Sequence, residues 1–573
     1  MIKNFKDIYE FLPGNYRKKY FNLIFFSFIV NALELISIAL VVPIIQIIFS
    51  DFSSKSVFLK VSEWMSFQIN VNHIFYIFIS VYLFKLIITY FINKYRENFT
   101  FNLNAEICSK LLKLYLSQPL IFFKEKNSSE LIKNINTEAW QACGGAIRPY
   151  IILISELMLV TILIIFLLNL YFFTSIIFIV IISLLSFLFF KYYKKRIHQY
   201  SKERVMAEEG VLRSFIESIG AIKEIKIFEK FEFFTKKFMH NKKKENDIRT
   251  KIEILSSIPR LFYEFILVII LLLFFLSSFI LNYQSTDVSY MVTAFLAVSI
   301  RLIPSFSRIN QSLQSCQMFM ISINIIQDDF KNLKNEFTEQ AKISKLNFNK
   351  KIEIANISFF YKNKKIIDNF SFEINKGDYV GIFGESGSGK TTLVNLILGL
   401  EKPDSGEILS DGQNINQNIL GWYKNFGMVH QSNFFLNDTV KNNISLKKEL
   451  LMSEENQKIE NILSELNLEK FIINEQSENE KYLVGERASK LSMGEQQRLA
   501  LARSLYKDIS ILILDEATSN LDKENELLIL KKIKEMNEKN LTVLHISHDK
   551  NTLTNANKIL ELKKNKIILE QIN

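Results

Sequence analysis

Six long apolar blocks in the first half of the chain constrain its fold more than any other feature of the sequence. The blocks are dominated by Ile, Leu and Phe, and a helix needs about 20 apolar residues to cross the hydrocarbon core of a bilayer. Six such blocks carry too much apolar surface for one small soluble core, so they predict six membrane-spanning helices. The blocks cover residues 20–49, 73–92, 150–170, 171–190, 261–281 and 288–303.

The second part of the chain has a different character. From about residue 345 the long blocks stop, and short apolar runs alternate with polar segments as in a soluble α/β domain. With 573 residues, the chain is also too long for one ordinary domain. We therefore expect an all-helical, six-helix transmembrane domain over residues 1–335, fused to an α/β domain over residues 336–573.

Basic residues in the connections predict the orientation of the helices. Lys and Arg gather before the first block, between the second and third, and between the fourth and fifth, whereas the other loops are short and nearly uncharged. The positive-inside rule then places both chain ends and the two long connections in the cytoplasm. Much of the net charge of +11 is explained in this way, so we expect a lipid bilayer and no nucleic acid as partner. The three cysteines are odd in number, and no disulfide is expected.

One segment of the second part fits the phosphate-binding loop G-x-x-x-x-G-K-[ST] at every fixed position. It follows a strand-like apolar run at 379–383 and opens a helical run at 392–398. In such a loop, backbone N–H groups turn toward phosphate oxygens, the lysine reaches the β- and γ-phosphates, and the last hydroxyl binds Mg²⁺. A nucleoside triphosphate with Mg²⁺ is therefore expected on Gly384, Glu385, Ser386, Gly387, Ser388, Gly389, Lys390 and Thr391.

Further candidate residues follow at the ends of strand-like runs. The run 511–514 ends in Asp515 and Glu516, which are placed to hold Mg²⁺ through water and to polarise the attacking water, respectively. Gln431 follows the run 426–429 and is placed to contact the same Mg²⁺, and His548 ends the run 542–547. Tyr361 precedes the loop and offers a ring that can stack on adenine.

This ordered set resembles the nucleotide-binding domain of ATP-binding cassette (ABC) transporters, and six spans ahead of it resemble a type I exporter half-transporter. The resemblance implies that Thr392 completes the phosphate loop, that Gln431 lies in the Q-loop, that residues 519–522 form the D-loop, and that His548 is the switch histidine. It also implies that Ser492, Gly494 and Glu495 form the signature, which contacts the ATP of a second subunit. One cassette per chain then implies a homodimer with two ATP sites.

Two features of the resemblance need separate mention. The usual S-G-G-Q signature is Ser492-Met493-Gly494-Glu495 in this chain, so that a bulky side chain stands beside the nucleotide. Exporters of this kind also carry short cytoplasmic helices that dock onto the cassettes, and the candidates are residues 123–136 and 213–222.

Charged residues inside the apolar blocks are candidates for substrate binding, because charges are costly in lipid. Lys85, Arg260, Arg301 and Arg308 would form a cationic stripe along a cavity, and the guanidinium fork of Arg matches phosphate oxygens. Arg301 and Arg308 are seven residues apart and share one helix face. The alternative is that these side chains extend to the cytoplasmic surface or pair with Glu34, Glu156 and Glu264.

The transmembrane part is also similar to the flippases of lipid-linked oligosaccharides in bacterial protein N-glycosylation and of lipid-linked O-antigen. The similarity lies in residues 31–43, 122–133, 258–260 and 301–304. It implies that the substrate is a polyprenyl-pyrophosphate-linked glycan, moved across the bacterial inner membrane, and that the arginines face the pyrophosphate. At the second-span position, Lys85 supplies a point charge instead of a fork.

Two alternatives remain open at this point. Within transport, the chain could export lipid A, a peptide or a hydrophobic drug. In another class, it could be an ATP-gated channel or a membrane regulator that binds ATP without pumping. The complete set of hydrolytic residues, Glu516 above all, favours ATP-driven transport.

Overall fold

The computed structural model shows two compact units, one formed by residues 1–118 and 122–336 and the other by residues 119–121 and 337–573. Each unit is described by itself. The structure describes residues 2–49, 71–170, 172–280, 285–333, 344–361, 364–447, 452–472, 484–485, 488–517, 523–563 and 566–571.

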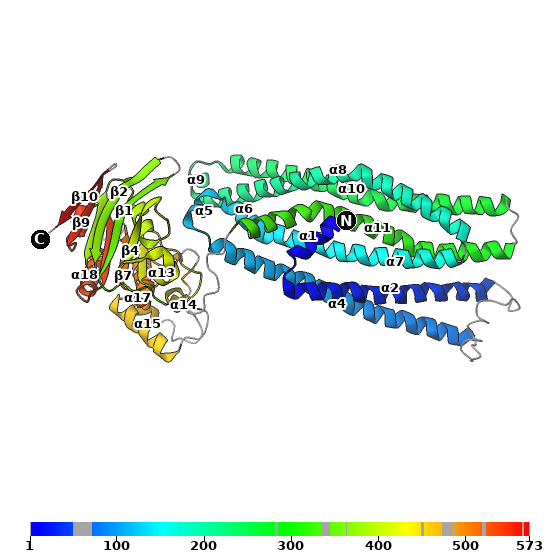
Figure 1. Cartoon of the computed structure of the whole chain (residues 1–573), viewed down its shortest axis with the longest axis horizontal. Coiled ribbons are helices and arrows are strands. Elements are labelled where there is room, and N and C mark those ends of the chain that lie inside the picture. The colour runs from blue at the N-terminus through cyan, green and yellow to red at the C-terminus, as the bar shows by residue number, and fades with distance from the viewer. Residues whose placement is uncertain are drawn as a thin grey trace. The chain divides into compact units, whose positions relative to one another are not determined.

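Six long helices dominate the first unit (Figure 1). Each of the six apolar blocks falls almost entirely in one of them, and four of the six helices, α4, α8, α10 and α11, run far beyond their block into charged sequence. The long helices are α2 (Gly14–Phe49), α4 (Val71–Leu116), α7 (Arg148–Leu170), α8 (Phe172–Gly220), α10 (Phe231–Ile280) and α11 (Ser285–Asn332). The short ones are α1 (Ile2–Phe11), α5 (Leu120–Glu125), α6 (Ser128–Lys133) and α9 (Ile222–Ile227).

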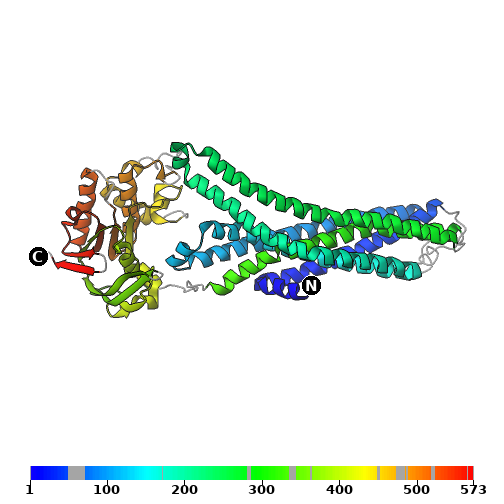
Figure 2. The same cartoon turned by 90° about the horizontal axis from the view of Figure 1, so that it is seen from above.

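Three helical stretches among the described residues are long and apolar enough to cross a membrane, namely Gly14–Ile38, Tyr76–Leu116 and Ser128–Asn169. The other three apolar blocks lie in α8, α10 and α11, where many side chains fall outside the described part. The helices α8 and α10 run side by side and are joined by α9 at one end (Figure 2).

The helix that leads into α7 contains two π-helical segments, Asn134–Glu138 and Gln141–Ile147. Its small residues Ala139, Ala142 and Ala146 are fully buried, and they belong to the same apolar core as Leu103, Ile107 and Leu111 of α4. The three α4 residues are spaced by four, so they form one stripe along that helix. Small side chains opposite a stripe of large ones allow the helices to approach closely.

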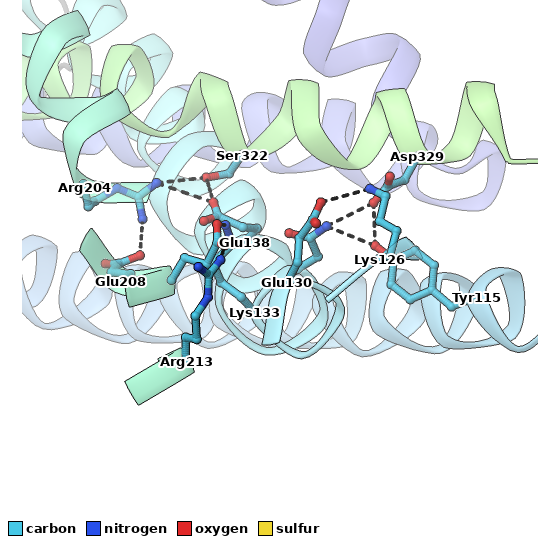
Figure 3. Close-up of polar contacts among 12 residues, drawn as sticks. Tyr115, Lys126, Glu130, Lys133, Glu138, Arg204, Glu208, Arg213, Ser322 and Asp329 are labelled. Carbon is cyan, nitrogen blue, oxygen red and sulfur yellow. Dashed lines mark hydrogen bonds and ion pairs between the residues drawn. The ribbon is translucent and has the colours of Figure 1, made fainter. Parts of the chain in front are cut away.

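A buried polar cluster ties three helices of this unit together (Figure 3). Glu138 lies in the first π-helical segment and is fully buried; its Oε2 accepts a hydrogen bond of 2.5 Å from Ser322 of α11. Arg204 of α8 places Nη2 3.5 Å from the same Oε2 and donates from Nη1 to Glu208 over 2.8 Å. Because buried charges are tolerated only with partners, this cluster fixes how the three helices fit together.

A second polar group lies beside the first along the same helices (Figure 3). Asn134 donates from Nδ2 to Asp329 of α11 over 3.1 Å and to the hydroxyl of Tyr115 over 3.2 Å. Tyr115, near the end of α4, donates to the same Asp329 carboxylate over 2.5 Å. The π-helical segment therefore contacts α4, α8 and α11 through polar side chains at its two ends.

The second unit contains two sheets. One has four antiparallel strands in the order β2-β1-β4-β5, and the other has six strands in the order β10-β9-β3-β8-β7-β6. In the larger sheet, β9, β3, β8, β7 and β6 are parallel to their neighbours, and β10 pairs antiparallel with β9. The strands are β1 (Lys351–Tyr361), β2 (Lys364–Asn375), β3 (Tyr379–Gly384), β4 (Ser405–Ser410), β5 (Gln413–Asn414), β6 (Phe426–His430), β7 (Ile511–Asp515), β8 (Thr542–Ser547), β9 (Lys558–Lys563) and β10 (Lys566–Gln571).

Helices cover the larger sheet. They are α12 (Lys390–Leu398), α13 (Ile419–Tyr423), α14 (Val440–Ser445), α15 (Ser453–Glu465), α17 (Met493–Tyr506) and α18 (Lys523–Asn537). The residues Ile511–Leu514 of β7 are almost completely buried on both faces, as is typical of a central parallel strand. Because β3, β6, β7 and β8 are parallel, their carboxyl ends meet at one edge, and the candidate site residues follow these ends.

Candidate functional site

The phosphate loop connects β3 to α12, as the sequence predicts. Gly389 is the N-cap of α12 and has φ of +103°, a backbone conformation that favours glycine. At Gly384 a Cβ atom would lie 2.4 Å from the carbonyl oxygen of Leu562, so that only glycine fits beside β9. These two positions let the backbone turn tightly between a buried strand and a helix N-terminus.

Lys390 begins α12 and reaches back over the loop. Its Nζ donates to the carbonyl oxygens of Gly384, over 2.8 Å, and Glu385, over 3.1 Å. The same Nζ lies 3.4 Å from Nδ1 of His548. Burial lowers the pKa of Lys390, and the nearby carboxylates of Glu516 and Asp515 oppose that shift. The ammonium therefore lies inside the loop, among the groups that the sequence places around a triphosphate.

The two carboxylates lie at the carboxyl end of β7. Asp515 pairs in register with His430 of β6 and Ile546 of β8, and its Oδ2 lies 3.6 Å from Nδ1 of His430. Glu516 follows with φ of +52°, and its carboxylate contacts Nε2 of His548. A non-glycine residue in the left-handed region at such a site is a typical sign of a functional constraint. The structure thus brings Lys390, Glu516 and His548 together.

Gln431 follows β6 and is exposed, with its main-chain oxygen facing α17. That oxygen accepts a hydrogen bond of 2.9 Å from Nε2 of Gln497, and the Oε1 of Gln497 accepts one of 3.0 Å from Asn433. Sequence analysis missed Gln497. The available signal is the pair of adjacent glutamines at 496 and 497, since neighbouring helix residues point about 100° apart and one of them must face inward.

The signature residues form the start of α17. Ser492 is the N-cap: its Oγ accepts from the N–H of Glu495 over 3.4 Å, and Glu495 Oε2 accepts from the N–H of Ser492 over 2.8 Å. This reciprocal capping box satisfies two helix-end donors. Lys470 forms an ion pair with the other oxygen, Oε1, of Glu495. Met493 is 46% exposed and points away from the core.

The other predicted nucleotide contacts are also placed. Tyr361 ends β1 and is half-buried, Thr391 is exposed on the first turn of α12, Thr392 is half-buried on that turn, and Gly494 is half-buried on α17. The predicted D-loop, residues 519–522, lies outside the described part of the chain.

The residues present fit a nucleoside triphosphate with Mg²⁺. The Oγ of Ser388 in the loop is buried and has no hydrogen-bond partner among the described residues, which leaves a donor for a phosphate oxygen. Thr391 and Asp515 offer the oxygen ligands that Mg²⁺ prefers. The donors, the lysine and the carboxylates are therefore of the kinds that bind a triphosphate and its metal ion.

The charged residues of the first unit do not stand alone. Nζ of Lys85 (α4) lies 2.8 Å from Oε2 of Glu34 (α2), and Nε of Arg301 (α11) lies 2.8 Å from Oε1 of the same carboxylate. Nε of Arg308 lies 2.8 Å from Oε1 of Glu156 on α7. Pairing with Glu34 and Glu156, the alternative in the sequence analysis, is therefore what the structure shows. Arg260 lies in α10, and its side chain is outside the described residues.

Two family models match the sequence. The model described as "ABC transporter transmembrane region" matches residues 20–302, and the model described as "ABC transporter" matches residues 367–519. Together they cover more than half of the chain, and the second one contains the phosphate loop, the Q-loop, the signature and the paired carboxylates.

Curated relatives match about half of the chain. An "ATP-dependent lipid A-core flippase" of Syntrophus aciditrophicus is 36% identical over 263 residues, which are 46% of this chain and 42% of that protein. A protein of the same description from Desulfotalea psychrophila is 34% identical over 282 residues, 49% of this chain and 47% of that protein. A leukotoxin translocation ATP-binding protein of Mannheimia glucosida is 34% identical over 280 residues, 48% of this chain and 38% of that protein. The matches thus span less than half the length of these relatives.

A solved structure shares the fold. A bacterial Atm1-family ABC exporter with ATP bound superimposes with a TM-score of 0.76, covering 96% of this chain and 94% of that chain. The sequence identity is 18%, so this likeness concerns the architecture: transmembrane helices fused to a nucleotide-binding domain.

Proposed function

This chain belongs to the ABC transporters, as an exporter half-transporter with a membrane domain and an ATP-binding domain, and we propose that it uses ATP to flip a polyprenyl-pyrophosphate-linked glycan across the bacterial inner membrane. The observation that carries the substrate class is the set of Lys85, Arg301 and Arg308 on apolar helices. Such charges are expensive in a membrane and are kept where an ionic substrate needs them.

The residues of the second unit have separate tasks in ATP hydrolysis. Lys390, Ser388 and the N–H groups of the loop would hold phosphate oxygens, and Thr391, Asp515 and Gln431 would hold Mg²⁺. When bound, ATP supplies the phosphoanhydride bond, and Mg²⁺ offsets its negative charge. Glu516 takes the proton of the attacking water, and His548, in contact with the Glu516 carboxylate, holds that carboxylate in place.

Two copies of the chain form the working unit in this proposal. Ser492 and Gly494 lie at the start of α17, and Ser492 is exposed there. In the family, the signature meets ATP held by the phosphate loop of the second subunit. A homodimer then has two ATP sites, with both chain ends in the cytoplasm.

Lipid A is the second candidate substrate. Two of the relatives are described as lipid A-core flippases, and lipid A also carries phosphate groups on a lipid. The toxin translocation proteins among the relatives point to a peptide substrate, for which three membrane cations have no evident use. The phosphate chemistry is common to both lipids, and transport assays must separate them.

Reconstitution into vesicles tests the proposal. We expect ATP to drive a fluorescent polyprenyl-pyrophosphate sugar across the bilayer, and the same preparation to move a labelled lipid A several-fold more slowly. A Glu516→Gln variant serves as the inactive control. ATPase activity stimulated by lipid A alone, with no movement of the sugar lipid, would show that lipid A, and not the glycan lipid, is the substrate. Ion conductance without ATP turnover would point to a channel.

A further inference from the structure

A single carboxylate joins two of the cations on the apolar helices. The two oxygens of Glu34 are divided between them, with Oε2 at 2.8 Å from Nζ of Lys85 and Oε1 at 2.8 Å from Nε of Arg301. The three residues come from α2, α4 and α11, so the contact bridges three helices. Nζ of Lys85 also lies over the ring of Tyr82, 4.8 Å from its centre.

The three charged side chains are largely shielded. The exposed fraction of the side chain is 11% for Glu34, 19% for Lys85 and 25% for Arg301. Shielded charges interact strongly, because little water screens them. Two cations and one carboxylate leave one net positive charge. In a shielded environment a neutral group would be less costly than this charged one.

Unsatisfied polar groups occur in this set and in the neighbouring pair. Arg301 Nε lies 2.8 Å from Glu34 Oε1 but is buried without a hydrogen-bond partner among the described residues. Arg308 meets Glu156 one-to-one, but Arg308 Nη2 and Glu156 Oε2 are buried without a hydrogen-bond partner among the described residues. Arg308 follows Arg301 by two helical turns of α11, with Pro304 between them. The unused donor of Arg308 therefore lies on the same helix, α11, as Arg301.

From this arrangement we propose that Glu34 is an internal counter-ion that occupies the place of the substrate anion, and that a pyrophosphate or phosphate group displaces it from Lys85 and Arg301. The inference rests on the proposed function, since it concerns the same cations. A phosphate group carries more negative charge and more acceptor oxygens than a carboxylate, so it can replace Glu34 on both cations.

The counter-ion has two consequences for binding. It keeps Lys85 and Arg301 at anion-binding separation when no substrate is present. It also weakens binding, because every phosphate must first compete with a carboxylate that is tethered in place. Weaker binding favours release on the far side, whereas two uncompensated cations would hold a phosphate too long.

A purely structural ion pair makes a different prediction. If Glu34 only tied α2, α4 and α11 together, its loss would loosen the unit and weaken ligand binding. If it competes with the ligand, its loss strengthens binding. The direction of the change in affinity therefore separates the two roles.

The test uses the full chain in nanodiscs of zwitterionic phospholipid, with farnesyl pyrophosphate as the probe and binding measured by thermophoresis. Glu34→Gln is expected to bind the probe about tenfold more tightly than the unchanged chain. Glu34→Gln combined with Lys85→Gln restores one net positive charge and is expected to return to within about threefold of the unchanged chain. Glu232→Gln, which removes an 85% exposed carboxylate at the start of α10, is the matched control and should stay within about twofold.

An equal or lower affinity of a folded Glu34→Gln variant would overturn the proposal, with cooperative thermal unfolding and retained nucleotide binding as proof of folding. Glu34→Asp keeps the charge but draws it back by one methylene. We expect about threefold tighter binding there, and no tightening would overturn the proposal even if the Gln variant does not fold. An equal gain in affinity for the uncharged alcohol farnesol would also overturn the proposal.

Measuring the binding of lipid A in the same assay tests the counter-ion role of Glu34 separately from the assignment of the substrate. If lipid A binds more tightly than the pyrophosphate probe and still gains from Glu34→Gln, the counter-ion is supported and the glycan assignment fails. If the unchanged chain prefers the pyrophosphate but Glu34→Gln changes nothing, the substrate assignment stands and the counter-ion is wrong.

Discussion

The side-chain Nε2 of Gln497 donates to the main-chain oxygen of Gln431 over 2.9 Å. The contact joins the helix that begins with the signature to the loop that follows β6. Gln497 is 3% exposed, so the contact is shielded from water. A shift of α17 is therefore passed directly to the Q-loop main chain, and both segments belong to the proposed ATP cycle.

Gln497→Ala is expected to lower the kcat of ATP hydrolysis about tenfold with little change in the affinity for ATP. The variant removes two hydrogen bonds, each worth about 1 kcal/mol, but leaves the phosphate loop intact. Steady-state ATPase assays and binding of a fluorescent ATP analogue measure the two quantities. Glu524→Gln, on the exposed start of α18, is the control. A loss confined to ATP affinity would contradict the assigned role.

Glu516→Gln is expected to lower ATP hydrolysis by about 10²-fold or more while ATP remains bound, because the amide cannot take a proton from water. Rapid filtration with labelled ATP should show nucleotide retained on the variant. His548→Ala leaves the Glu516 carboxylate in place and removes a side chain that contacts it and Lys390, so a smaller loss is expected. Hydrolysis by Glu516→Gln close to that of the unchanged chain would remove Glu516 from the role of base.

Arg204→Ala is expected to destabilise the first unit by about 3–5 kcal/mol, because it leaves the buried carboxylate of Glu138 without its cation. Arg213 on the same helix forms a comparable pair with Glu209, but its side chain is 50% exposed. Arg213→Ala should therefore cost less than about 1 kcal/mol. Thermal unfolding of both variants in detergent makes the comparison (Figure 3). Equal losses would show that burial does not decide the outcome.

The stability of the second unit is expected to fall as the pH drops from about 6.5 toward 4. Burial lowers the pKa of His545 to about 4, and the imidazole lies 3.1 Å from the hydroxyl of Tyr379. The unfolded chain then binds a proton in this window that the folded chain does not, so protonation favours unfolding. The slope contributed by this group reaches about 1.4 kcal/mol per pH unit.

Chemical unfolding of the full chain between pH 7 and 5 measures that slope. His545→Gln cannot titrate and should show a flatter pH dependence, although the variant itself is less stable. The same slope in both chains would mean that other groups govern the acid sensitivity.

The motif residues were predictable from sequence because each follows a strand end. Gly384, Gln431, Asp515 and His548 come directly after runs of apolar residues, and parallel pairing brings such ends to one edge. Local motifs in a fixed order were thus sufficient to predict the residues of the nucleotide site. The membrane blocks were predictable by length, but an apolar criterion detects only the apolar part of a helix, so it missed the charged extensions of α4, α8, α10 and α11.

Partners of the membrane cations were harder to choose. The sequence offered two kinds of partner for these cations, a substrate phosphate or carboxylates such as Glu34 and Glu156. Which carboxylate meets which cation depends on how α2, α4, α7 and α11 are rotated about their axes. The short helix expected within residues 213–222 also shifted, because α8 continues to Gly220 and α9 covers Ile222–Ile227. The change of chain direction follows Gly220, not Arg213. Met493 is exposed at the start of α17.

The two π-helical segments before α7 have a consequence for residues far along the same rod. A turn of this kind contains one additional residue. All later side chains are therefore rotated about the helix axis by about 100° relative to their positions on an uninterrupted α-helix. Removing one residue at Gly144 would turn Glu156 away from Arg308 while Glu138 kept its own place. The wide turns thus set the rotation that lets one continuous helix place Glu138 in its polar cluster and Glu156 beside Arg308.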